Sequence, residues 1–172
     1  AVEEVQRGSA YEMREALLDN GIRVLTERRP DVRSAAVGVW VEQGSAHETP
    51  ESAGVSHLIE HLVFKGTERR SAHEIALSLE SLGGSLDAYT TREFTSYQAH
   101  VLDEHLSVAL DVLADLVLNP RLDTADLELE KGVVIEEIAG VEDTPDDLVF
   151  DLHGAKFWNG HTYGRPILGT RE

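Results

Sequence analysis

The chain has 172 residues, enough for about one ordinary domain with a real core, and 41% of them are hydrophobic against 27% charged. Asp and Glu outnumber Lys and Arg by 32 to 15, and the resulting net charge of −17 argues against nucleic acid as a partner, because that needs a cationic surface. No cysteine is present, so any transition-metal site must be built from His, Asp or Glu.

The first third of the chain has the patterns of strands. After a polar lead-in, residues 11–18 and 22–28 are strand-like runs joined by residues 19–21, whose Asn-Gly favours a tight hairpin turn. Residues 35–41, AAVGVWV, are apolar at nearly every position, which is typical of a central strand covered on both faces. A polar loop, residues 44–52, then leads into a helix.

That helix carries the main motif, within GVSHLIEHLVFKGT at residues 54–67. His57 and His61 are four residues apart, so on a helix they lie on one face, with Cβ atoms about 5–6 Å apart, and can share a metal ion. Glu60 can reach the surroundings of the same ion. The neighbouring residues are mostly apolar, and burying such groups without a partner costs free energy. The alternative is that both histidines are solvent-facing or satisfied core residues.

The rest of the chain predicts a helix, two strands and further helices. Ser71 and Glu74 have the spacing of a capping box, and Gly83-Gly84 ends the helix that they begin. Strands are expected at residues 85–91 and 94–101, and helices at residues 103–118, 123–141 (capped by Asp123) and 145–157. We therefore expect one α+β unit, with a sheet that carries its helices on one face.

Two histidines leave a zinc site one ligand short, because catalytic zinc typically takes three protein ligands and keeps a fourth position for water. Residues 127–143, LELEKGVVIEEIAGVED, offer Glu130 and Glu137, two turns apart on one helical face. Glu128 and Glu136 point elsewhere and have the pattern of solvated positions. The apolar segment between the first pair makes Glu137 a ligand candidate. The alternative for any one of these acids is an ordinary surface helix.

The sequence resembles the N-terminal part of the pitrilysin-type, or inverzincin, zinc metallopeptidases, and most of all the branch that contains processing peptidases. Besides the His-x-x-Glu-His motif, the matching segments are HLIEHLVFKGT, GGSLDAYTTREFTSY, ELEKGVVIEEI and YGRPILGT, in the family's order. The resemblance implies one Zn²⁺ bound by His57, His61 and Glu137. It also implies that Glu60 is the general base and that Glu130 orients the site from outside the ligand set.

By the same resemblance, residues 85–91 bind an extended peptide that adds to an exposed sheet edge, next to Asp87, Ala88 and Tyr89. Asp87 departs from the family pattern, because many relatives have an asparagine at this position, beside the alanine matched by Ala88. The alternative is that this strand is simply a covered edge.

The implied function is a zinc-dependent endopeptidase acting on unfolded or extended peptides. Family members are similar in having two homologous halves, so residues 1–172 are expected to be an incomplete N-terminal metal-bearing domain. The full-length protein is expected to contain a second homologous half or to form a dimer. Residues 1–172 alone should have little or no activity. A non-catalytic structural or partner subunit of the same fold is the alternative. Such subunits generally lose metal or base residues, whereas His57, Glu60, His61 and Glu137 are all present here.

The expected partner is a peptide, with no nucleic acid and no membrane insertion, since no stretch approaches the ~18–20 apolar residues of a membrane span. A chain without cysteines is compatible with reducing and oxidising compartments. The bacterial cytoplasm is the default location, and a periplasmic or secreted origin stays open.

Overall fold

The computed structural model describes residues 2–7 and 11–171, with side chains from residue 11 onward. The chain divides into two compact units, Ala1–Ser34 and Ala35–Glu172. The predicted α+β class is confirmed, but the strands belong to two separate sheets rather than to one unit.

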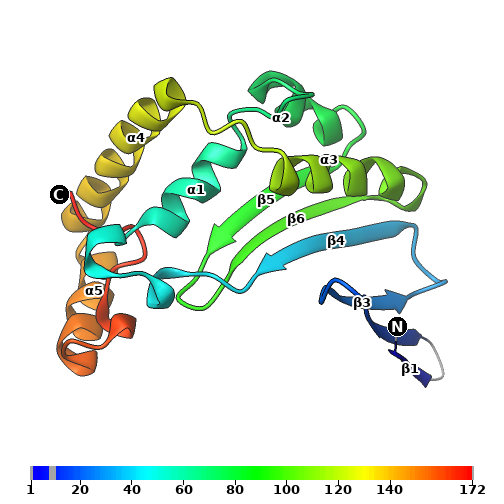
Figure 1. Cartoon of the computed structure of the whole chain (residues 1–172), viewed down its shortest axis with the longest axis horizontal. Coiled ribbons are helices and arrows are strands. Elements are labelled where there is room, and N and C mark those ends of the chain that lie inside the picture. Colours follow the sequence, from blue (N-terminus) through cyan, green and yellow to red (C-terminus); the bar gives the residue numbers. More distant parts are fainter. Residues whose placement is uncertain (1, 8–10, 172) are drawn as a thin grey trace. The chain divides into compact units, whose positions relative to one another are not determined.

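The first unit is a three-stranded antiparallel sheet in the order β1-β2-β3 (Figure 1). Its strands are β1 (Val2–Arg7), β2 (Glu12–Leu17) and β3 (Arg23–Arg28). The hairpin between β2 and β3 is confirmed, and its turn contains Gly21 at φ +88°, a conformation that favours glycine. The polar lead-in was expected to be outside the strands, and this was wrong. Strand β1 is held by backbone pairing with β2, which side-chain polarity does not reveal.

The sheet of the second unit has the order β4-β6-β5. Its strands are β4 (Ser34–Val41), β5 (Ser85–Thr90) and β6 (Thr95–Leu102), and β5 pairs with β6 in antiparallel register. Among the described strands β6 is the middle one and β4 lies at an edge, with 56% of Trp40 exposed. The prediction of a central, doubly covered strand at residues 35–41 was therefore wrong. An apolar run shows that a strand packs on a core, but it does not show on how many sides the strand is paired.

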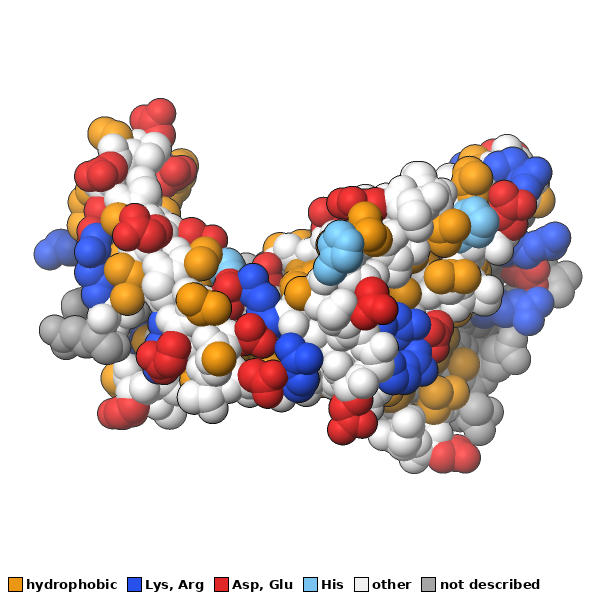
Figure 2. Space-filling model, turned by 90° about the horizontal axis from the view of Figure 1, so that it is seen from above, with side chains coloured by type: hydrophobic (Ala, Val, Ile, Leu, Met, Phe, Trp, Pro, Cys, Tyr) orange, Lys and Arg blue, Asp and Glu red, His pale blue; other side chains and the backbone are white. Residues whose placement is uncertain are grey.

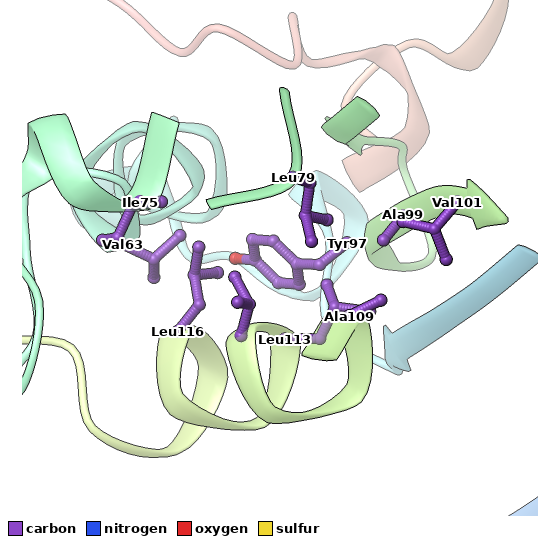
Figure 3. Packing of buried hydrophobic residues seen from close by; sticks show 10 residues of the cluster. Val63, Ile75, Leu79, Tyr97, Ala99, Val101, Ala109, Leu113 and Leu116 are labelled. Atoms are coloured by element: carbon purple, nitrogen blue, oxygen red, sulfur yellow. The ribbon is translucent and has the colours of Figure 1, made fainter. Parts of the chain in front are cut away.

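Three helices cover one face of this sheet, as predicted (Figure 1): α1 (Val55–Val63), α2 (Ala72–Glu80) and α3 (Leu106–Leu118). The core lies between the helices and the sheet, with the ring of Tyr97 among aliphatic side chains (Figure 3). Its buried members are Val63, Ile75, Leu79, Tyr97, Ala99, Val101, Ala109, Val112, Leu113 and Leu116. Since α1 packs on this core, the motif helix has a fixed place over β5 and β6.

Two further helices follow, α4 (Thr124–Asp143) and α5 (Pro145–Trp158), and α4 packs against both α1 and α5. The predicted capping box of α2 is confirmed, because the Glu74 carboxylate accepts a hydrogen bond from the Ser71 backbone N–H at 2.8 Å. Asp123 is the N-cap residue of α4, but its side chain pairs with Arg121 at 2.6 Å instead of capping the helix. None of the helices in the described part is long and apolar enough to cross a membrane.

Candidate metal centre

His57 and His61 lie one turn apart on α1, and their ring centroids are 4.6 Å apart. Helix α4 brings Glu137 opposite both rings. Its carboxylate oxygens lie 3.6 Å from Nε2 of His57 and 3.7 Å from Nε2 of His61. One ligand atom from each of the three residues lies within 4.8 Å of the other two. The structure therefore brings together His57, His61 and Glu137, the three ligand candidates predicted from the sequence.

The spacing of these donors fits a zinc ion. Two donors at about 2.0–2.1 Å from a tetrahedral ion are roughly 3.3 Å apart, close to the separations between Glu137 and the two rings. The same separations are too long for good hydrogen bonds, so Glu137 and the two histidine rings face one another without forming hydrogen bonds between them. Burial lowers the pKa of His57, and the neighbouring His61 lowers it further. A neutral imidazole is the form that binds a metal.

Glu130 is buried, with 7% of its side chain exposed, and its carboxylate Oε2 lies 3.0 Å from Nδ1 of His61. If this nitrogen donates its hydrogen to the carboxylate, Nε2 of His61 is left with a lone pair on the side of Glu137. The other carboxylate oxygen of Glu130 pairs with Nζ of Lys65 at 2.7 Å. Burial acts to raise the pKa of Glu130, but the hydrogen bonds from Lys65 and His61 outweigh it and hold the pKa below its usual value.

Glu60, on the same helix, contacts a different element. Its Oε2 accepts a hydrogen bond of 2.5 Å from the hydroxyl of Thr90 at the end of β5. The candidate base is thus held by the sheet, while the two histidines face Glu137 on α4.

The N-terminus of α1 is capped from outside the helix. Gly54 at the N-cap has no side chain to offer, and the buried carboxylate of Glu48 takes that role. It accepts hydrogen bonds from the backbone N–H groups of Gly54 at 2.7 Å and Ser56 at 2.8 Å. A negative charge is favourable at this end of a helix, so Glu48 fixes the first turn, which includes His57.

The segment after α1 is hydrogen-bonded to α3 and to the residues just before α4. The hydroxyl of Thr67 donates to the buried carboxylate of Asp115 at 2.8 Å, and Arg70 donates to the same oxygen at 2.5 Å. The backbone N–H of Arg121, just before α4, donates to the carbonyl oxygen of Gly66 at 2.9 Å. This junction joins the two helices that carry the candidate ligands.

The residues predicted to bind substrate lie on β5, which is at an edge of its sheet. Asp87 is exposed and Tyr89 is 43% exposed, whereas Ala88 points the other way and packs on the core. The alternation follows from the period of two in a strand. The structure therefore separates the three residues: two face away from the helices and one faces toward them.

Sequence reasoning singled out His57, Glu60, His61, Glu130 and Glu137, and the structure brings all of them to the contact between α1 and α4 or to its border with β5. It missed four supporting residues: Glu48, Lys65, Thr90 and Asp115. A weak signal existed for Lys65, a cation four residues after His61, but α1 ends at Val63, so the helical spacing does not itself place this side chain. The other three lie on elements whose pairing with α1 is set by tertiary structure.

Comparison with known proteins identifies the family of the chain. Residues 23–171 match the family described as Insulinase (Peptidase family M16). The chain belongs to peptidase family M16. This confirms the resemblance to the pitrilysin-type metallopeptidases found in the sequence.

Among the similar proteins, "Uncharacterized zinc protease YmxG" of Bacillus subtilis is 52% identical over 153 residues, which are 89% of this chain and 37% of that protein. "Probable mitochondrial-processing peptidase subunit beta, mitochondrial" of Arabidopsis thaliana is 42% identical over 164 residues, 95% of this chain and 31% of that protein. A crystal structure of a protease from Helicobacter pylori has a TM-score of 0.86 at 24% identity, over 91% of this chain and 38% of that one, and shows the fold. The chain thus spans 31–38% of the length of these proteins.

Proposed function

We propose that this chain carries the metal-binding part of a zinc-dependent endopeptidase that hydrolyses unfolded or extended peptides. In this proposal His57, His61 and Glu137 bind one Zn²⁺, Glu60 is the general base, and Glu130 orients His61. The observation that carries the proposal is the convergence of three ligand atoms within 4.8 Å of one another, beside a carboxylate from the same helix. The names of the M16 relatives as zinc proteases support it.

When bound, zinc would lower the pKa of a water molecule and polarise the carbonyl of the scissile peptide bond. Glu60 accepts a proton from the attacking water and passes a proton to the leaving amine nitrogen. Oε2 of Glu60 is held by Thr90, so Oε1 would be the oxygen that accepts the proton. Glu130 keeps His61 in one ring orientation, so the ligand nitrogen does not need to reorganise.

The placement of β5 supports a role in substrate binding. Among the described strands, β5 pairs only with β6, so the backbone groups of its other side can pair with an extended peptide. Asp87 and Tyr89 on the exposed face would then contact alternate side chains of the substrate. Acidic side chains are spread over the surface seen in Figure 2, with apolar and basic ones between them, so the net charge alone does not define a site for basic peptides.

We also propose that a second homologous half, or a partner subunit, encloses the substrate in the complete protein. The relatives are about three times as long as the part that this chain matches, and one of them is named as a subunit. Peptide binding by β5 and catalysis by Glu60 would then take place in a chamber that two such domains form.

The test compares the full-length protein with its Glu60→Gln variant, by measuring bound zinc and the cleavage of unstructured peptides. We expect one zinc per chain in both proteins, and cleavage reduced by about 10²–10⁴-fold in the variant, because only the proton acceptor is lost. Equal cleavage by both proteins would remove Glu60 from its role. Stoichiometric zinc without cleavage, also in the presence of the partner subunit where one encloses the substrate, would instead identify a non-catalytic subunit.

A further inference from the structure

Thr90 is the last residue of β5, and its hydroxyl lies 2.5 Å from Oε2 of Glu60. A carboxylate can only accept, so the threonine donates its single hydroxyl hydrogen to Glu60. The bond is partly buried, at the point where the sheet passes under α1. It is the one hydrogen bond to the Glu60 carboxylate among the described residues.

The direction of the Thr90 side chain follows from the strand itself. Leu86 and Ala88 alternate with it on the same face of β5, and both pack against the core under the helices. Thr90 therefore cannot turn to the exposed face without moving two packed neighbours. Its register partner in β6, Thr95, fixes the end of the ladder.

Thr95 does not compete for the same hydrogen bond. Its hydroxyl donates to the backbone carbonyl of Gln43 at 3.0 Å, which occupies its only hydrogen. The hydroxyl oxygens of Thr90 and Thr95 are 3.4 Å apart, longer than the usual O–H···O distance of about 2.7–2.8 Å. The two threonines thus have separate roles: one contacts Glu60, and the other ties the sheet to the loop before α1.

We propose that Thr90 is a positioning residue for Glu60, and that its hydrogen bond couples the substrate-binding strand to the general base. The inference rests on the proposed peptidase function. A general base must lie within about 2.6–3.2 Å of the heavy atom whose proton it accepts, and a glutamate side chain has several rotamers. Holding Oε2 of Glu60 from β5 selects one of them and directs Oε1 to the water. Strand β5 would then position both the bound peptide, through its backbone, and the general base Glu60, through Thr90.

The test uses Thr90→Val, which keeps the β-branched shape but removes the hydroxyl, and Thr90→Ser, which restores it. In the zinc-loaded full-length protein, we expect Thr90→Val to lower kcat by about 10- to 100-fold, the size of effect that a small misplacement produces. KM and zinc affinity should stay within about twofold of wild type, since neither β5 pairing nor the ligands change. Thr90→Ser should restore kcat to within about threefold of wild type.

Thr95→Val is the matched control, because it removes a hydroxyl from the same strand pair without touching Glu60. It should lower thermal stability and leave kcat near wild type. A wild-type kcat in Thr90→Val would overturn the inference, as would an equal loss of kcat in both valine variants. Absence of peptide cleavage by the wild type would mean that the proposed function itself fails, and the inference with it. An active wild type and an active Thr90→Val would reject the inference alone.

Discussion

Nδ1 of His61 lies 3.0 Å from Oε2 of Glu130, although the two residues are 69 positions apart in the chain. This contact joins α1 to α4 and is extended by Lys65, whose Nζ lies 2.7 Å from the other oxygen of the same carboxylate. A buried carboxylate with two cationic or donor partners is held in place, and it holds the ring of His61 in turn.

The first prediction concerns Lys65. We expect Lys65→Met to lower zinc affinity by about 10-fold, because Glu130 then loses a charged partner and holds His61 less firmly. A chelator competition titration measures the affinity. Lys131→Met is the control, since Lys131 pairs with Glu128 at 2.8 Å on the exposed side of α4. Equal affinities for the two variants would show that Lys65 does not act on the site.

The second prediction concerns the cap of α1. Glu48→Ala should lower the free energy of unfolding by about 1–2 kcal/mol, because two backbone N–H groups at the helix start lose their acceptor. It should also weaken zinc binding, since His57 is the third residue of the same helix. Urea unfolding measures the first effect. Glu51→Ala, at an exposed position of the same loop, should change stability by less than about 0.5 kcal/mol.

The third prediction concerns the junction between α1 and α4. Asp115 is 2% exposed and accepts hydrogen bonds from Thr67, Arg70 and Asn119. Asp115→Asn should cost about 3 kcal/mol or more, because it removes the buried counter-charge of Arg70 and leaves only the exposed Asp111. Asp111→Asn removes an exposed partner of the same arginine and should cost less than about 1 kcal/mol. Similar losses in both variants would contradict the assigned importance of the buried carboxylate.

The fourth prediction concerns acid stability. Burial acts to raise the pKa of Asp115, but its hydrogen bonds from Thr67, Arg70 and Asn119 outweigh this and lower the pKa below 3.8. A folded-state pKa below the unfolded value contributes stability that is fully present above about pH 3.8 and is lost as the pH falls through the folded value. The metal-free protein should therefore lose stability below that pH. Asp115→Asn should show a shallower decline in the same range, measured by urea unfolding at several pH values.

Local signals in the sequence predicted much of the second unit. The capping box at Ser71 and the helix ends at glycine or proline depend on neighbours in the chain, so they can be found without a fold. The pair His57 and His61 was found for the same reason, since their proximity follows from helical spacing alone. Glu137 was reached through the number of ligands that zinc needs and the apolar segment before it.

Contacts between distant elements could not be predicted in the same way. Strand β1 and the edge position of β4 depend on which strands pair, and this is not encoded in one strand's pattern. Glu48 and Thr90 looked like ordinary loop and strand residues, and they gain their roles only because the loop and β5 both lie against α1. Such residues act by positioning other residues through tertiary contacts, so no short sequence motif marks them.

The most direct test of the metal centre is the zinc affinity of two neighbouring variants of α4 in the full-length protein, Glu137→Gln and Glu136→Gln. Glu137 faces both histidines, whereas Glu136 is an exposed residue one position earlier on the same helix. We predict that Glu136→Gln binds one zinc with wild-type affinity and that Glu137→Gln binds zinc more than about 10-fold more weakly. Ten-fold is the lower bound, because the loss of a residue that only supports a ligand already weakens metal binding by about that factor. Wild-type zinc affinity in Glu137→Gln would contradict the assignment of the third ligand.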